Sequence, residues 1–133
     1  SYGIERGNIQ VGQARDVNPG LTTFVSRLYT KALGREYEEA GLNEWCARIN
    51  NKKWNINDVS TTGFFNSPEF LNKHTTNEQY VTILYHTFFD REPDTAGYND
   101  WMGKLGSGVS RNDVLQGFAN SPEFSNLKKS FGL

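Results

Sequence analysis

Two arginines could present a guanidinium group to an anionic ligand, since Arg35 and Arg91 occupy corresponding places in a repeated sequence. The structural alternative is that each arginine holds a loop in place by pairing with a carboxylate or with the last carbonyl groups of a helix. Glu69 and Glu123 also correspond to each other and could supply those carboxylates. Because the two copies share these residues, we interpret both arginine–glutamate pairs as part of the architecture.

Aromatic side chains in polar segments are the second class of candidate. Trp54 follows Lys52 and Lys53, and it has no aromatic counterpart in the second copy, where Ser107 and Gly108 occupy the region. An exposed tryptophan can stack on a sugar ring or anchor a protein partner. The alternative is partial burial against a neighbouring helix. Both interpretations also apply to two tyrosines in polar surroundings, Tyr37 and Tyr98.

Metal binding is not indicated. Acidic residues gather at 36–39 and 90–94, but the Asp-x-Asp-x-Asp-Gly run of calcium loops is missing, and acids at helix N-termini explain both groups. The single thiol, Cys46, is far in sequence from His74 and His86, whereas a zinc site uses about four ligands with close pairs. We therefore expect neither a metal nor a cofactor.

Catalytic patterns are also missing. The serines lie in helix caps rather than in a Gly-x-Ser-x-Gly elbow, and neither a phosphate-binding loop nor a dinucleotide fingerprint occurs. Cys46 with a histidine is an alternative, but a lone cysteine on a helix is more often a small core residue. A glycosidase carboxylate pair also stays open, although no acid stands in an apolar setting that would raise its pKa. We predict that the protein is not an enzyme.

The composition narrows the class of protein. The chain has 133 residues, of which 14 are basic and 15 acidic, with a net charge of −1, and it lacks the basic block of a nucleic-acid-binding protein. No apolar run is long enough for a transmembrane helix, so we expect no membrane insertion. Aromatic residues make up 14% of the chain, which predicts an aromatic core.

A repeat of roughly 55 residues organises the chain. The offset between copies is 56 at first, shortens to 55 at Asn57–Val59 and to 54 at Asn66–Phe70, because single residues are lost in loops, where deletions are tolerated. Gly97 is the counterpart of Gly41, and Trp101 is the counterpart of Trp45. The residues that recur 56 positions later are Val25, Leu28, Tyr29, Arg35, Glu36, Ala40, Gly41, Asn43 and Trp45.

Each copy is predicted to form about four helices. Apolar residues at i, i+1, i+4, i+5, i+8 and i+9 from Phe24 and from Tyr80 give the first helix one buried face. Thr22 or Thr23 can cap this helix in the first copy, and Thr76 opens a capping box in the second.

The second helix is expected over 39–50 and 95–104, with Trp45 and Trp101 on its buried face. The third begins at a polar cap followed three residues later by aspartate. The fourth begins at a Ser-Pro-Glu-Phe element, in which serine caps, proline takes the first turn and glutamate faces the positive end of the helix dipole. No segment alternates with period two, so the fold is expected to be all-α. The capping serines are Ser67 and Ser121.

We divide the chain into three parts. Residues 1–21 lack periodicity, and we interpret them as a linker with the tail of a preceding repeat, since Ser1–Ile4 matches Ser130–Leu133 in pattern. The first copy is assigned to 22–75 and the second to 76–133. The two copies are expected to pack as one compact helical domain within a longer array.

The combined motif resembles the bacterial domain of unknown function 4214 family, through its Leu-Tyr, Gly-x-x-x-Trp and Ser-Pro-Glu-Phe elements over residues 24–70 and 80–124. The helical linker domain of phycobilisomes is similar in pattern. The first copy departs from the family motif with Tyr37-Glu38 in place of Pro-Asp. The second has Asp90 where a glycine usually precedes the arginine.

The resemblance implies a repeat module of a large secreted or surface protein in bacteria, and it brings no catalytic residues. We therefore expect a non-catalytic, extracellular or cell-surface module for display, spacing or adhesion. Its expected partners are a glycan or a protein, together with adjacent repeats of the same chain, and not nucleic acid. The alternatives are a carbohydrate-binding module of a secreted hydrolase and a protein scaffold of the phycobilisome-linker type.

Overall fold

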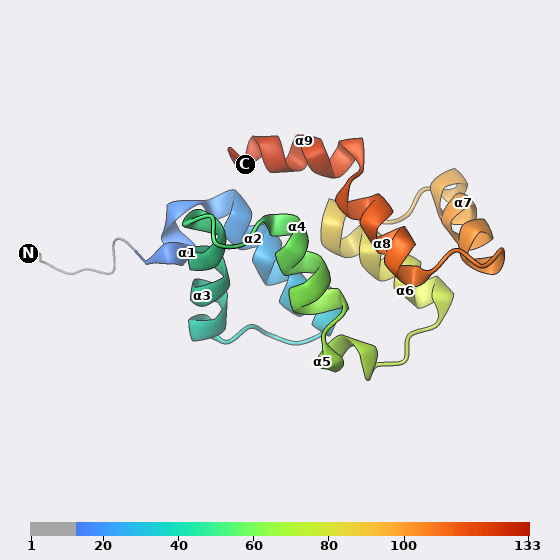
Figure 1. The fold of residues 1–133 in the computed structure, drawn as a ribbon, viewed down its shortest axis with the longest axis horizontal. Helices are drawn as coiled ribbons and strands as arrows, with labels where there is room; N and C mark the ends of the chain where they lie inside the picture. The colour runs from blue at the N-terminus through green and yellow to red at the C-terminus, as the bar shows by residue number, and fades with distance from the viewer. Residues whose placement is uncertain (1–12) are drawn as a thin grey trace, which may run out of the picture.

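The protein is all-α in the computed structural model, which describes residues 13–133 (Figure 1). No strand occurs within that range, which confirms the predicted fold class. The helices are α1 (Ala14–Val17), α2 (Pro19–Arg27), α3 (Glu39–Asn50), α4 (Ile56–Asp58), α5 (Pro68–Leu71), α6 (Asn77–Leu84), α7 (Thr95–Gly106), α8 (Arg111–Ala119) and α9 (Pro122–Ser130). Three of them continue as wider π-helical segments, η1 (Leu28–Leu33), η2 (Val59–Phe65) and η3 (Tyr85–Phe89).

Each copy contains the four predicted helices once the π-helical segments are joined to the helices that they continue. The first copy consists of α2–η1, α3, α4–η2 and α5, and the second of α6–η3, α7, α8 and α9. Figure 1 shows the two copies side by side, with α9 running back over the first copy towards the N-terminal helices. The short helix α1 precedes the first copy.

The N-terminal boundary differs from the prediction. The sequence predicts a linker over 5–21, but α1 and the first turn of α2 lie inside it. The overlooked signal is Asn18-Pro19, a cap followed by a proline at the first helical position. Asn18, rather than either threonine, caps α2 by accepting a hydrogen bond from the Leu21 backbone N–H at 3.2 Å. Residues 1–12, with the predicted tail of a preceding repeat, lie outside the described range.

The other predicted caps are confirmed. Thr76 and Gln79 form a complete capping box at the start of α6, in which the Thr76 N–H donates to the Gln79 side chain at 2.9 Å. Each cap of this kind stabilises its helix by about 1 kcal/mol and fixes where the helix begins. Side chains accept a backbone hydrogen bond at five further helix starts, at Asn55, Ser67, Asp94, Ser110 and Ser121.

The first long helix of each copy ends in the same way. Gly34 follows η1 with a φ of 74°, and Asp90 follows η3 with a φ of 53°. Aspartate is among the few residues besides glycine that adopt this left-handed conformation readily. The second copy therefore makes the same turn without the glycine that the family motif favours.

The core is aromatic, as the composition predicts. Its rings meet mostly tilted or edge to face, and Phe88 lies 4.8 Å from Phe124 and 6.0 Å from Phe24 between ring centroids. The contact between Phe24 and Phe88 joins the two copies, and the buried residues form one hydrophobic cluster. The buried rings are Phe24, Tyr29, Phe64, Phe65, Phe70, Tyr80, Tyr85, Phe88, Phe118 and Phe124.

Aromatic contacts between the copies come in reciprocal pairs. Phe24 of α2 packs against Phe124 of α9, with ring centroids 5.2 Å apart. The corresponding residues are Tyr80 of α6 and Phe70 of α5, whose ring centroids are 6.0 Å apart. The first helix of each copy thus packs against the fourth helix of the other.

Amide contacts repeat this pattern. The Asn57 side chain donates to that of Asn120 at 3.3 Å, and the Asn66 side chain donates to that of Asn112 at 3.2 Å. Asn57 corresponds to Asn112 in the repeat, and Asn66 to Asn120, so each contact is the counterpart of the other. Reciprocal contacts are the signature of a two-fold interface. The two copies are therefore related by an approximate two-fold axis.

The symmetry is broken at the outer ends of the molecule. α1 packs across α3, where the Asn43 side chain accepts from the Arg15 N–H and the Asn50 side chain donates to the Ala14 carbonyl, both at 3.0 Å. α7 is the counterpart of α3, and none of its residues is fully buried.

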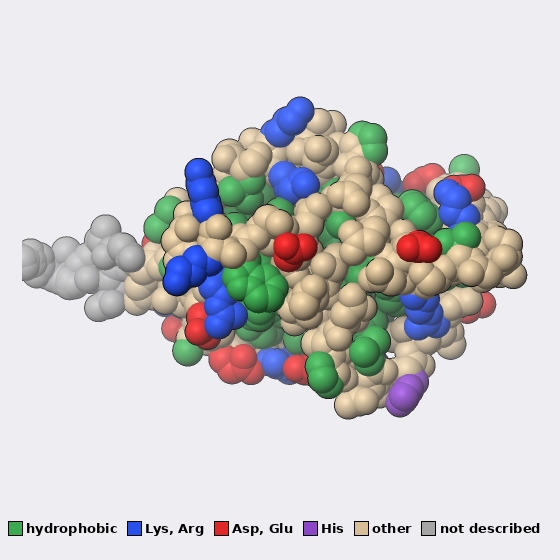
Figure 2. Space-filling view, in the orientation of Figure 1, with side chains coloured by type: hydrophobic (Ala, Val, Ile, Leu, Met, Phe, Trp, Pro, Cys, Tyr) green, Lys and Arg blue, Asp and Glu red, His purple; other side chains and the backbone are tan. Residues whose placement is uncertain are grey.

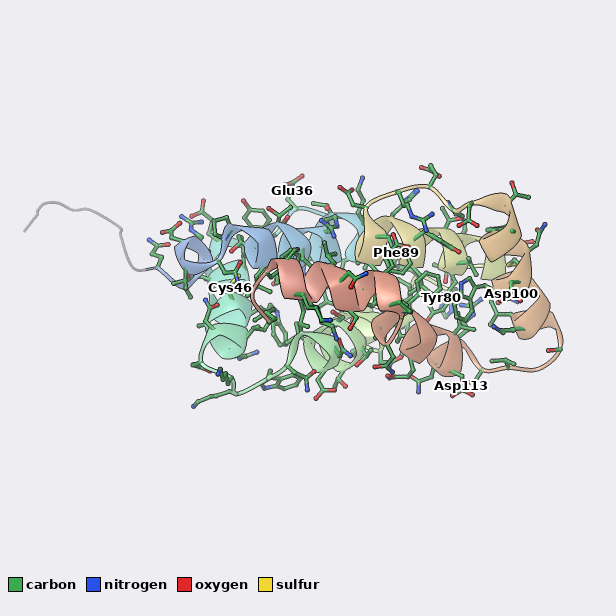
Figure 3. All side chains as sticks on the ribbon, turned by 90° about the horizontal axis from the view of Figure 1, so that it is seen from above. Glu36, Cys46, Tyr80, Phe89, Asp100 and Asp113 are labelled. Carbon is green, nitrogen blue, oxygen red and sulfur yellow. The ribbon has the colours of Figure 1, made fainter. Side chains whose placement is uncertain are left out.

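The C-terminal helix ties the second copy to the N-terminal part of the first. The Asn18 side chain donates to the Phe131 carbonyl at 2.7 Å, and the Phe131 ring lies so close to Gly20 that an added Cβ would be 2.6 Å from it. Figure 3 shows α9 from above, extending along the molecule towards the half that contains Cys46. The two copies therefore form one body.

Two helical glycines test the packing of the second copy. Gly117→Ala places a Cβ 2.6 Å from the Trp101 ring, so we expect the free energy of unfolding to fall by about 1–3 kcal/mol. Gly103→Ala meets nothing within 4 Å, so it should raise that free energy by about 0.5–1 kcal/mol through its higher helix propensity. Urea unfolding followed by circular dichroism measures both, and changes of equal sign would contradict the described packing of Trp101.

Candidate functional site

A large hollow lies between the two copies, and we name it the inter-copy groove. Its volume is about 1140 Å³. One wall is the connection from α3 to α4 with the start of α4–η2, and the other is formed by α8, α9 and the residues that follow α9. The polar and aromatic residues of its lining include Lys52, Lys53, Trp54, Asn55, Asn57, Asp58, Asn120, Lys128 and Lys129.

Trp54 is positioned at the groove by the end of α3. The backbone N–H groups of Lys53 and Trp54 both donate to the Arg48 carbonyl, at 3.0 and 3.1 Å. The Trp54 indole meets that of Trp45 edge to face, with ring centroids 5.7 Å apart. Trp54 is therefore half-buried: it packs against the core on one side and lines the groove on another.

The second copy makes the same turn without the aromatic side chain. The Val109 N–H donates to the Lys104 carbonyl, five residues earlier, at 3.0 Å, as the Lys53 N–H does to the Arg48 carbonyl, so Val109 takes the place of Lys53 and Trp54 is an additional residue of the first copy. Lys52 corresponds to Gly108, and both have positive φ, of 64° and 103°. A side chain in this left-handed region costs about 1–2 kcal/mol. The first copy thus keeps a lysine where the second has the residue suited to the turn.

Lysines surround Trp54 on both walls of the groove. Lys52 and Lys53 come from the first copy, and Lys128 and Lys129 come from the second. Among the residues that the structure describes, none of these four lysines lies within ion-pair distance of a carboxylate. Figure 2 shows Lys and Arg side chains around an exposed hydrophobic patch on this face. The groove is therefore cationic with unpaired charges.

The remaining polar groups of the groove are mostly amides. Asn57 accepts a hydrogen bond from Lys128 Nζ at 3.1 Å and donates to Asn120 at 3.3 Å. Asp58 is the one acidic residue in the lining, and it accepts from the Asn55 side chain at 3.0 Å. The amides can donate and accept hydrogen bonds along the groove.

The approximate two-fold axis places a second, smaller groove opposite the first. Its volume is about 320 Å³. Where the inter-copy groove has Lys128 and Lys129, the corresponding residues of this groove are His74 and Thr75. The two positions that carry lysines in the inter-copy groove therefore carry no lysine in the smaller groove.

Arg111 fills the smaller groove. Its guanidinium group donates to the Thr75 carbonyl and to the Asn77 side chain, each at 2.8 Å, and it lies over the Tyr80 ring, 4.9 Å from the centroid. The residue that corresponds to Arg111 in the first copy is Ile56, which is buried and makes no such bridge. The guanidinium group therefore bridges and narrows the smaller groove, and the inter-copy groove lacks such a bridge.

The repeated arginines hold each copy together. Arg35 donates to both carboxylate oxygens of Glu69, at 2.6 and 3.1 Å, and Arg91 does the same to Glu123, at 3.1 and 2.8 Å. Each guanidinium group also lies over a buried tyrosine ring, 5.2 and 5.1 Å from the centroids. These contacts fasten the turn after the first helix to the fourth helix, in agreement with the structural interpretation of both pairs.

The repeated glycines give the tyrosines and tryptophans room. A Cβ at Gly41 would lie 2.7 Å from the Tyr29 hydroxyl, and one at Gly97 would lie closer still to the Tyr85 hydroxyl. Burial raises the pKa of both tyrosines. Gly63 and Gly117 likewise face the two indoles. The second helix can therefore pack closely on the first and on the third.

Trp45 and Trp101 are less buried than predicted. Both pack against the core but remain partly exposed. A flexible cation lies over each indole, with Arg48 4.6 Å from the Trp45 centroid and Lys104 4.6 Å from that of Trp101.

The other candidates lie elsewhere. Tyr37 is 36% exposed and Tyr98 is partly buried, and neither lines the inter-copy groove. Cys46 is fully buried beside the Thr22 hydroxyl, and burial raises the pKa of its thiol. Within residues 13–133 no group of three or more metal-ligating side chains occurs, and no helix there is long and apolar enough to cross a membrane.

Sequence reasoning missed the second wall of the groove. Lys128, Lys129 and Asn120 approach Trp54 only because the copies pack around the two-fold axis. The sequence nevertheless contains a signal, since Lys128 and Lys129 occupy the positions that His74 and Thr75 have in the first copy. A difference between the copies is also the feature that marks Trp54.

Arg35→Ala is expected to lower the free energy of unfolding at neutral pH by about 1 kcal/mol, because the Arg35–Glu69 pair is partly exposed and screened. The Arg35 hydrogen bond lowers the pKa of Glu69. The contribution of the pair is therefore complete above pH about 4.3 and is lost as the pH falls through the lowered pKa of the folded state. Thermal unfolding of wild type and variant across this range measures the difference, which should disappear in acid. Unchanged stability at neutral pH would contradict the structural role.

Lys52→Gly should stabilise the protein by about 1 kcal/mol, since glycine adopts the left-handed conformation of this residue without steric cost. Lys53→Gly is the matched control, because Lys53 does not have a positive φ and the change there should be neutral or destabilising. Denaturant unfolding gives both values. A loss of stability in Lys52→Gly would show that the lysine side chain contributes to folding.

One family matches the chain twice, over residues 13–73 and 61–128, and its description is "Domain of unknown function (DUF4214)". The overlap at 61–73 contains the fourth helix of the first copy, which precedes the first helix of the second. No match was found among curated proteins or solved structures. Since the two matches together cover most of the chain, the protein belongs to the DUF4214 family and contains two tandem copies of its domain.

Proposed function

We propose that this chain is a non-catalytic binding and spacing module of an extracellular or cell-surface protein, and that it binds a glycan in the inter-copy groove. The observation that carries the proposal is the difference between two equivalent sites. Trp54 lines the larger groove, whereas Arg111 bridges and narrows its smaller counterpart. A scaffold that needed only to fold could fill both sites.

The groove offers the two kinds of contact that a sugar ring uses. The apolar face of a pyranose ring packs against an aromatic side chain, for which Trp54 is placed at the groove wall. Sugar hydroxyl groups donate and accept hydrogen bonds, as amides also do. Asn55, Asn57 and Asn120 provide such groups next to the indole.

The acidic residues support a role without catalysis. A general acid at neutral pH needs a carboxyl group whose pKa is raised. Among the described residues the shifted carboxyl pKa values are lowered instead: that of Glu69 chiefly by its hydrogen bond with Arg35, and that of Asp94 chiefly by the Gly97 backbone N–H. The Asp58 carboxylate accepts a hydrogen bond from the side chain of Asn55, the residue that caps α4. These acids are engaged in holding the fold.

The compact body supports a spacing role. The two copies share one hydrophobic core, and α9 fastens the end of the second copy to the start of the first. The resemblance to repeats of secreted and surface proteins favours a longer array with adjacent repeats as neighbours. In such an array each two-copy unit would contribute one open groove.

Trp54→Ala is expected to weaken glycan binding about tenfold or more, because a half-buried indole at the centre of a binding surface carries a large share of the binding energy. A glycan array identifies the ligands, and a titration of the best one gives the affinity of each variant. Tyr37→Ala is the matched control, since Tyr37 is an exposed aromatic residue outside the groove. Thermal unfolding confirms that both variants fold.

Three results would lead elsewhere. An array without hits would contradict glycan binding. Hits confined to the substrates of one hydrolase would favour the carbohydrate-binding module of a secreted enzyme. Capture of a helical protein partner, with no glycan bound, would favour a scaffold of the phycobilisome-linker type.

A further inference from the structure

We infer that the ligand of the inter-copy groove is an anionic polysaccharide whose sugar rings carry carboxylate groups. The inference rests on the proposed function, because it names the class of glycan for the same groove. Its basis is the set of groove lysines together with the single indole and the amides between them.

The charge of the groove departs from that of the chain. Four lysines stand against one aspartate in the lining, which leaves a formal charge of +3, whereas the whole chain has a net charge of −1. Like charges gathered on two facing walls repel one another unless an anion lies between them. A carboxylate between the walls removes this repulsion.

Five of the nine described lysines and arginines outside the groove lie within ion-pair distance of a carboxylate: Arg15, Arg35, Arg48, Arg91 and Lys104. Among the described residues none of the four groove lysines has such a partner. The Lys128 ammonium group donates to the Asn57 side chain and lies over the Phe124 ring, 5.3 Å from the centroid. The groove lysines are therefore available to a carboxylate from outside the chain.

The reciprocal groove shows that the fold does not require these charges. His74 and Thr75 replace Lys128 and Lys129 there, and Gly108 replaces Lys52. Lys52 is kept in spite of its left-handed backbone conformation. Because the fold forms without lysines at the corresponding positions, Lys52, Lys128 and Lys129 are available to bind a ligand.

The uncharged groups of the groove favour a polysaccharide over other polyanions. Proteins that bind single-stranded nucleic acids stack successive bases on several aromatic rings, whereas the groove has one indole. An acidic peptide would offer carboxylates without the row of hydroxyl groups that Asn55, Asn57 and Asn120 can bond. A uronic acid polymer supplies a ring face, hydroxyl groups and one carboxylate per residue.

The test compares polygalacturonate with its methyl-esterified form, which keeps the sugar rings and loses the charge. We expect wild-type protein to bind polygalacturonate, and to bind the methyl ester at least tenfold more weakly. Binding should weaken as the ionic strength rises from about 0.05 to about 0.5 M. Lys52→Gln/Lys53→Gln and Lys128→Gln/Lys129→Gln should each weaken it about fivefold.

The control removes two charges outside the groove, as Lys31→Gln/Lys104→Gln, and should leave binding unchanged. Thermal unfolding of all three double variants verifies their fold. Equal binding of the methyl ester, dependent on Trp54 and insensitive to salt, would overturn this inference and leave the proposed function standing. Equal binding of polyglutamate or single-stranded DNA would overturn it in favour of charge alone. If neither polygalacturonate nor any array glycan binds, both proposals are wrong.

Discussion

The packing of each copy's first helix against the other copy's fourth helix is the constraint on which the structure depends. Phe24 lies against Phe124, and Tyr80 against Phe70, so neither copy covers its own first helix completely. A unit of roughly 55 residues buries too little surface to be stable with such a face exposed. The two copies consequently fold as one body, and the arginine–glutamate pairs, which act within a copy, hold each fourth helix where the other copy needs it.

An approximate two-fold interface produces every feature twice, including the hollow that flanks it. Two equivalent grooves therefore arise from packing alone, without selection for a ligand. One difference between them is that Arg111 bridges the smaller groove, whereas its counterpart Ile56 makes no such bridge in the larger one. Duplication thus supplies a scaffold and a spare site together, and substitutions in one copy can change that site while the other copy keeps the fold.

The features predictable from the sequence are those that depend on local chemistry or on repetition. The caps at Thr76 and Asp94 follow from neighbouring residues, and the Arg35–Glu69 pair follows from its recurrence. The helix start at Asn18 was overlooked because apolar periodicity begins later. The approach of Lys128 to Trp54 depends on how the copies pack, and two repeats that fold alike can be arranged in several ways. The lack of an aromatic counterpart in the other copy predicted Trp54, but the sequence analysis did not predict a role for Lys128.

A comparison within one chain separates the demands of folding from those of binding. Gly108 and Lys52 hold the same left-handed turn, so the fold accepts glycine at this position and pays a steric cost for lysine. The same applies to the lysines at the positions of His74 and Thr75, since their charges add repulsion to a groove that already contains Lys52 and Lys53. Because the two positions share a backbone and neighbouring helices, stability does not account for the difference. The residues that cost stability in one copy are therefore the ones on which a ligand should depend.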